Sequence, residues 1–190
     1  MRYFSLLLCA GFFMSCTNSE LYEKGTKQLD SLEGAMGLIS KEILSSDTLQ
    51  LQKALERFTT YRLFIKTNVN DTILPGEAEN IKRFFASGTA LEAYSKNRPV
   101  LLERAGLIHT QITKLRNDIS NLLIDEQVLM MALEKENKTS AELTGLMLEQ
   151  QKKYYSALQE FKQVLPLTEE FIRKHNKGDL PTLVKQNEDF

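Results

Sequence analysis

After residue 20, apolar residues recur at alternating intervals of three and four along almost the whole chain, and this spacing constrains the fold most. In a helix, residues at these intervals line one face, whereas a half-buried strand needs strict alternation. Stripes of this kind precede and follow a polar break at residues 45–47, and again at residues 137–138. We therefore expect an all-α protein made of two helical hairpins.

The first predicted hairpin spans residues 21–67 and folds back near Asp47. Asp47 is followed three residues later by Gln50, which is typical of an N-cap box at the start of a helix. A turn at this point places the apolar residues of the two stripes opposite one another, with Met36 facing Phe58. The sequence thus predicts an antiparallel pair of helices.

The second predicted hairpin spans residues 99–178 and is longer, with a coiled-coil-like stripe on each arm. Pro99 suits the first turn of a helix, and Thr139 with Glu142 forms a capping box after the break at residues 137–138. This register places Glu126 opposite Gln150. The pair is either a polar layer that fixes the register, as in coiled coils, or a solvated layer beyond the core.

Residues 68–98 should connect the hairpins through loops and two short helices. The result is an antiparallel, up-down-up-down four-helix bundle over residues 21–178. Residues 179–190, which follow Gly178, are predicted to form a C-terminal tail.

The N-terminus is predicted to be a targeting segment. Arg2 precedes an apolar stretch over residues 3–14, which is shorter than the roughly 20 residues of a membrane-spanning helix. Residues 1–15 are therefore interpreted as a signal peptide that is removed from the mature protein. Residues 16–20 would then be a short tether before the bundle.

The tetrapeptide Phe13-Met14-Ser15-Cys16 resembles a bacterial lipobox, in the loose form found in lipoproteins of Bacteroidota. The resemblance implies that the Cys16 sulfur receives a diacylglycerol and that Cys16 becomes the acylated N-terminus, with palmitate as a typical chain. Two or three acyl chains form a durable membrane anchor. The alternative is a soluble secreted protein in which Cys16 has no special role.

By the same resemblance, Thr17 favours the outer membrane, because lipoproteins retained in the inner membrane typically carry Asp after the lipidated Cys. The segment from Thr17 to Glu20 lacks the acidic cluster associated with export to the cell surface. The periplasmic face of the outer membrane is therefore favoured over the surface.

Charge and motif content argue against catalysis and nucleic-acid binding. Lys and Arg number 24 against 25 Asp and Glu, so no basic excess favours nucleic acid. A di-metal bundle enzyme needs Glu three residues before His, but Gly106 precedes His109 and Ile172 precedes His175 at that distance. We expect no enzyme activity, cofactor or metal.

These observations predict a lipid-anchored envelope protein that acts as a non-catalytic protein-interaction or structural module. Its partners would be the membrane, through Cys16, and another envelope protein; the sequence does not indicate an oligomeric state. Met130, Met131 and Leu148 are candidate partner-binding residues near the predicted hairpin tip, since Met adapts to binding surfaces. Core packing is their alternative role.

Two further possibilities remain open. Thr72, within Asp71-Thr72-Ile73, resembles an O-glycosylation site of Bacteroidota periplasmic proteins, although Thr72 is alternatively a simple turn residue. The protein is alternatively a sensor or carrier that holds a small apolar ligand between its helices. The rings that would line such a site are Phe58, Tyr61, Phe84, Phe85 and Phe161.

Overall fold

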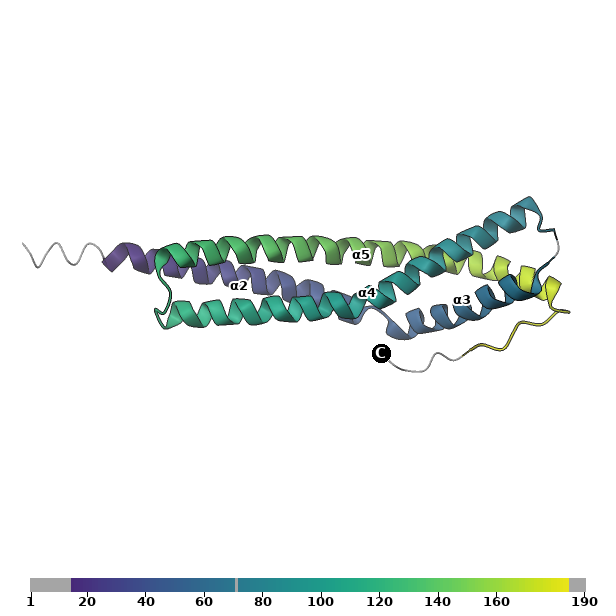
Figure 1. The fold of residues 1–190 in the computed structure, drawn as a ribbon, viewed down its shortest axis with the longest axis horizontal. Helices are drawn as coiled ribbons and strands as arrows, with labels where there is room; N and C mark the ends of the chain where they lie inside the picture. Colours follow the sequence, from purple (N-terminus) through teal and green to yellow (C-terminus); the bar gives the residue numbers. More distant parts are fainter. Residues whose placement is uncertain (1–14, 71, 185–190) are drawn as a thin grey trace, which may run out of the picture. The chain divides into compact units, whose positions relative to one another are not determined.

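The computed structural model of the protein describes residues 15–70 and 72–184. These residues form four α-helices and no strand: α2 (Ser15–Ser45), α3 (Thr48–Asn68), α4 (Pro75–Ser120) and α5 (Glu126–His175) (Figure 1). The predicted all-α class and the predicted number of long helices are confirmed. The up-down order of the helices stays a prediction, and most of the predicted signal peptide, residues 1–14, lies outside the described residues.

The chain forms two compact units, and α4 and α5 each contribute to both. The first unit comprises the described part of Met1–Glu42 together with Leu101–Met147. It contains most of α2, the last part of α4 and the first part of α5. The second unit comprises Ile43–Val100 and the described residues from Leu148 onward, and it contains α3, the first part of α4 and the last part of α5.

In the first unit, α4 and α5 run antiparallel from a turn at residues 121–125. Their buried positions fall opposite each other when counted outward from this turn, as expected for two facing helices. These positions are Leu101, Ala105, Ile108, Ile112, Leu115 and Ile119 on α4, and Leu129, Leu133, Glu136, Ser140, Leu143 and Met147 on α5. Helix α2 completes the unit through buried Leu29 and Met36. It also accepts hydrogen bonds from α4, because the Arg116 guanidinium donates to Asp30 Oδ1 at 2.7 Å and to Glu33.

The second unit has an aromatic core. The Phe84 ring lies 5.5 Å from the Phe58 ring and 5.3 Å from the Phe161 ring, centroid to centroid, and thereby joins α4 to α3 and α5. Tyr94 and Tyr154 stack with centroids 4.3 Å apart. Large rings of this kind bury much apolar surface and add favourable ring–ring geometry.

The turn between α4 and α5 lies at residues 121–125, so the predicted break at residues 137–138 was wrong. Asp125 caps α5, because its Oδ1 accepts a hydrogen bond from the backbone N–H of Val128 at 2.9 Å. Thr139 does not cap a helix; its hydroxyl donates to the carbonyl of Lys135 within the continuous α5. Glu126 and Gln150 share this helix, so the polar layer predicted between them does not exist.

The predicted crossover at residues 68–98 was also wrong, because most of these residues belong to one continuous helix. A loop connects α3 to Pro75, but α4 then runs without interruption to Ser120 and includes Pro99, which was expected to begin a new helix. The two predicted short helices are parts of this continuous helix, within which the Ser87 hydroxyl donates to the carbonyl of Arg83. One long helix therefore replaces the predicted short ones.

The break between the first two helices was predicted at its observed position, whereas the antiparallel pairing of these helices stays a prediction. Asp47 is the N-cap of α3, and its Oδ1 accepts from the N–H of Gln50 at 2.9 Å. However, Met36 belongs to the first unit and Phe58 to the second, so the predicted register between them is not part of the packing of either unit. Residues 16–20, predicted as a tether, lie within α2.

Two buried tyrosines should make the second unit sensitive to alkaline pH. Burial raises the pKa of Tyr154 to about 12. Burial, and the hydrogen bond that its hydroxyl donates to Glu169, raise the pKa of Tyr61 to about 12 as well. An unfolded tyrosine has a pKa of about 10. The contribution of Tyr61 and Tyr154 to the free energy of unfolding is therefore fully present below this pH and is lost as the pH rises towards 12.

We therefore expect the free energy of unfolding to fall between about pH 10 and 12. The Tyr61→Phe/Tyr154→Phe double variant should show a shallower fall, because phenylalanine cannot ionise. Urea unfolding followed by circular dichroism at a series of pH values measures both slopes. Equal slopes for the double variant and the wild type would show that ionisation of Tyr61 and Tyr154 does not cause the fall.

Candidate functional site

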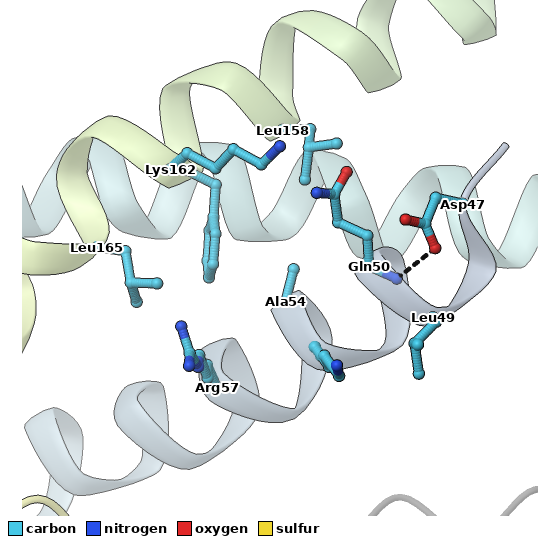
Figure 2. A pocket seen from close by; sticks show the side chains of 10 residues that line it. Asp47, Leu49, Gln50, Ala54, Arg57, Leu158, Lys162 and Leu165 are labelled. Atoms are coloured by element: carbon cyan, nitrogen blue, oxygen red, sulfur yellow. Dashed lines mark hydrogen bonds between the residues drawn. The ribbon is translucent and has the colours of Figure 1, made fainter.

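An open groove of about 300 Å³ lies between α3 and the last part of α5, within the second unit (Figure 2). Its floor is apolar and mostly buried, and is formed by Ala54 of α3 together with Leu158 and Phe161 of α5. Its position follows from the helix register: Ala54 is small, so α3 leaves room beside the larger side chains of α5. The apolar surface that stays accessible in the groove comes from exposed Leu49 and half-buried Leu165, which border this floor.

Three cations line this groove. Lys53 and Arg57 lie one turn apart on α3, and Lys162 comes from the opposite helix, α5; Figure 2 shows the Arg57 and Lys162 side chains on their two helices. All three are exposed. The single acidic residue of the lining is Asp47, whose carboxylate already accepts the N–H of Gln50.

None of these three cations forms an ion pair with another described residue. Other cations of the second unit do form such pairs, as in Arg62 with Glu92 and Arg83 with Glu160. The groove therefore combines an apolar floor with an excess of positive charge. Chemically, this arrangement suits an anionic group attached to an apolar surface.

The aromatic rings predicted to hold a small ligand instead form the core. Phe58, Tyr61, Phe84 and Phe161 are buried, and their rings pack against one another. A ligand between them would have to displace these contacts. Among these rings, Phe161 is the one that also lines the groove.

The three residues predicted as a partner-binding tip are all exposed. Met130 and Met131 lie in the second turn of α5, in the first unit, and Leu148 belongs to the second unit. Core packing, the alternative considered for them, is therefore excluded. They do not form a hairpin tip, because α5 is continuous from Glu126 to His175.

Cys16 and Thr72 are the two predicted modification sites. Cys16 is the second residue of α2, and its lipidation stays a prediction. Thr72 is exposed in the loop between α3 and α4, whereas its motif partner Asp71 lies outside the described residues. Exposure in a loop is compatible with both the glycosylation and the turn interpretation of Thr72.

Sequence reasoning missed several unusual residues, most of them in the first unit. Leu122 and Leu123 are highly exposed in the turn, while buried polar atoms without a hydrogen-bond partner occur at Glu136, Ser140 and Gln151. The polar residues interrupt the apolar stripe of α5, and that interruption was the available signal. The turn was not predicted from the sequence because the run Leu122-Leu123-Ile124 is apolar, whereas turns are usually polar.

No family model, curated protein or solved structure matches this chain. Over residues 15–70 and 72–184, no helix is both long and apolar enough to cross a membrane. Across the same ranges, no group of three or more His, Cys, Asp or Glu residues is arranged to hold a metal ion.

Proposed function

We propose that this chain is a lipid-anchored protein of the bacterial envelope that acts without catalysis, as a protein-interaction module. Its docking surface is the groove of the second unit, and its partner presents an acidic, amphipathic segment. The observation that supports this proposal is the apolar floor flanked by Lys53, Arg57 and Lys162, none of which is paired with an acid among the described residues.

A segment of a protein fits this groove better than a small molecule does. Small-molecule sites typically bury most of the ligand surface, whereas the rim here is formed by exposed side chains. A partner segment would cover the open side with its own backbone and bury apolar side chains on the floor. Its carboxylates would meet the three cations, which favours the correct partner and speeds encounter.

The anchor is proposed on the resemblance of residues 13–16 to a lipobox. Lipidation of Cys16 would attach the acyl chains directly to the start of α2, which begins at Ser15. The outer membrane is proposed because Thr17 stands where inner-membrane lipoproteins typically carry Asp, and the periplasmic face because residues 17–20 lack an acidic cluster. Glycosylation of Thr72 would modify the exposed loop before α4.

Charge reversal in the groove should abolish partner contact. A photo-crosslinking amino acid in place of Leu49, an exposed residue of the groove lining, should yield a discrete protein adduct in cells. The Lys53→Glu/Arg57→Glu/Lys162→Glu variant should lose this adduct, because carboxylates would face carboxylates. Gel electrophoresis of the crosslinked protein measures the result.

The matched control is Lys96→Glu/Lys152→Glu/Lys177→Glu, which changes the net charge equally at exposed positions outside this groove. It should retain the adduct. Loss of the adduct in both variants, or no adduct at all, would contradict the proposed surface. A crosslink to a lipid-sized molecule instead of a protein would show that the groove binds an amphiphile and would overturn the proposed class of partner.

A further inference from the structure

The turn of the first unit carries two conspicuously exposed leucines. Leu122 and Leu123 each expose 74% of their surface, more than any other large apolar residue that the structure describes. Two adjacent leucines in water contribute nothing to the core of the unit. Their exposure therefore needs an explanation outside the folding of this chain.

The backbone of the turn makes the choice of leucine more unusual. The N–H of Leu123 donates to the carbonyl of Asp118, and the N–H of Leu122 donates to that of Ile119. These bonds form a Schellman motif, which ends α4 with Leu122 in the left-handed conformation, at φ 53°. Glycine or asparagine normally occupies this position, because a larger side chain is strained there.

The turn lies at the end of the first unit from which α2 starts. The Tyr22 hydroxyl of α2 donates to the carbonyl of Ile124 at 2.8 Å. Tyr22 follows Cys16 by six residues in the same helix, which corresponds to about 9 Å of helix length. Helical side chains lean towards the N-terminus, so the Tyr22 hydroxyl and the turn lie still nearer to the level of Cys16.

We propose that Leu122 and Leu123 insert into the surface of the lipid bilayer as a second membrane contact beside the anchor. This inference rests on the proposed lipidation of Cys16, which would hold the turn at the membrane. The anchor makes the contact intramolecular, so two leucines suffice where they would be too weak alone. Membrane contact explains both the exposure of the pair and the leucine at the strained position.

The contact should be apolar and not electrostatic. Asp118, Asp125 and Glu126 flank the turn, and residues 117–134 contain no lysine or arginine. Attraction to anionic lipid headgroups would require such cations. The insertion is therefore expected in zwitterionic lipid and should be insensitive to salt.

The absence of tryptophan from the chain allows a direct test. The Leu123→Trp variant would be purified from membranes with its native N-terminus and placed in phosphatidylcholine vesicles. Its fluorescence should shift to the blue, and vesicles with brominated acyl chains should quench it. Leu38→Trp is the matched control: Leu38 is 72% exposed in the same unit, about 24 Å beyond Tyr22 along α2, and should show neither effect.

Vesicle flotation of the same samples separates this inference from the proposed function. Flotation with quenching at residue 123 alone supports the inserted turn. Flotation with equal, water-like emission from both variants overturns the proposed insertion of the turn but still supports the lipid anchor. Failure of the membrane-purified protein to float overturns the lipid anchor itself, and the inference with it.

Discussion

Replacing Gly88 with alanine should strongly destabilise the protein. A β-carbon at this position would lie 2.0 Å from Cδ2 and 2.3 Å from Cε2 of Phe58, far inside van der Waals contact. The ring has little room to move, because it is fully buried against Phe84 and Phe85 and the Arg62 guanidinium covers it. We expect a loss of about 3 kcal/mol or more, at the upper end of overpacking effects.

Gly106→Ala is the control for this prediction. Gly106 lies in the same helix, α4, and a β-carbon there would meet nothing within 4 Å. Alanine should therefore stabilise the helix by up to about 1 kcal/mol, the usual difference in propensity. Urea unfolding measures both variants, and a similar change at the two positions would show that Phe58 does not restrict residue 88.

Replacing Cys16 with serine should move the protein from the membrane fraction to the soluble fraction. Without the thiol, no diacylglycerol can be attached, and the described helices alone provide no membrane-spanning segment. The change replaces one sulfur atom with oxygen, so the free energy of unfolding of the described units should not change. Fractionation with immunoblotting, and the mass of the N-terminal peptide, measure the outcome.

Cys9→Ser supplies the matched control, because Cys9 is the only other cysteine of the chain and follows the bulky Leu8. This variant should remain with the membranes. If the Cys16 variant also remained there, the anchor would not be an acyl chain on Cys16. If the wild type were soluble, the protein would be secreted without an anchor.

The helical class and the start of α3 were predictable from the sequence because both depend on local chemistry. Asp47 and Gln50 are three residues apart, and the cap that they predict is the cap observed. The turn between α4 and α5 was not predictable in this way. Its chain reversal uses Leu122 where glycine is usual, and the stronger polar signal at residues 137–138 belongs to a continuous helix.

The candidate groove shows a second limit of sequence reasoning. Lys53 and Arg57 are visibly one helical turn apart, and their common face could be read from the sequence. Their association with Lys162 depends on how α3 packs against α5. Apolar stripes with similar spacing can be aligned in several registers, so the stripe did not determine that packing.

The first unit is assembled from two segments that lie far apart in the sequence, and this separation affects folding during synthesis. Leu29 and Met36 of α2 are buried in a unit whose other segment begins at Leu101 and ends at Met147. At ribosomal rates of about 5–20 residues per second, that segment follows several seconds later. During this interval the apolar face of α2 lacks the segment against which it packs, so the first unit can close only after residue 147 has been made.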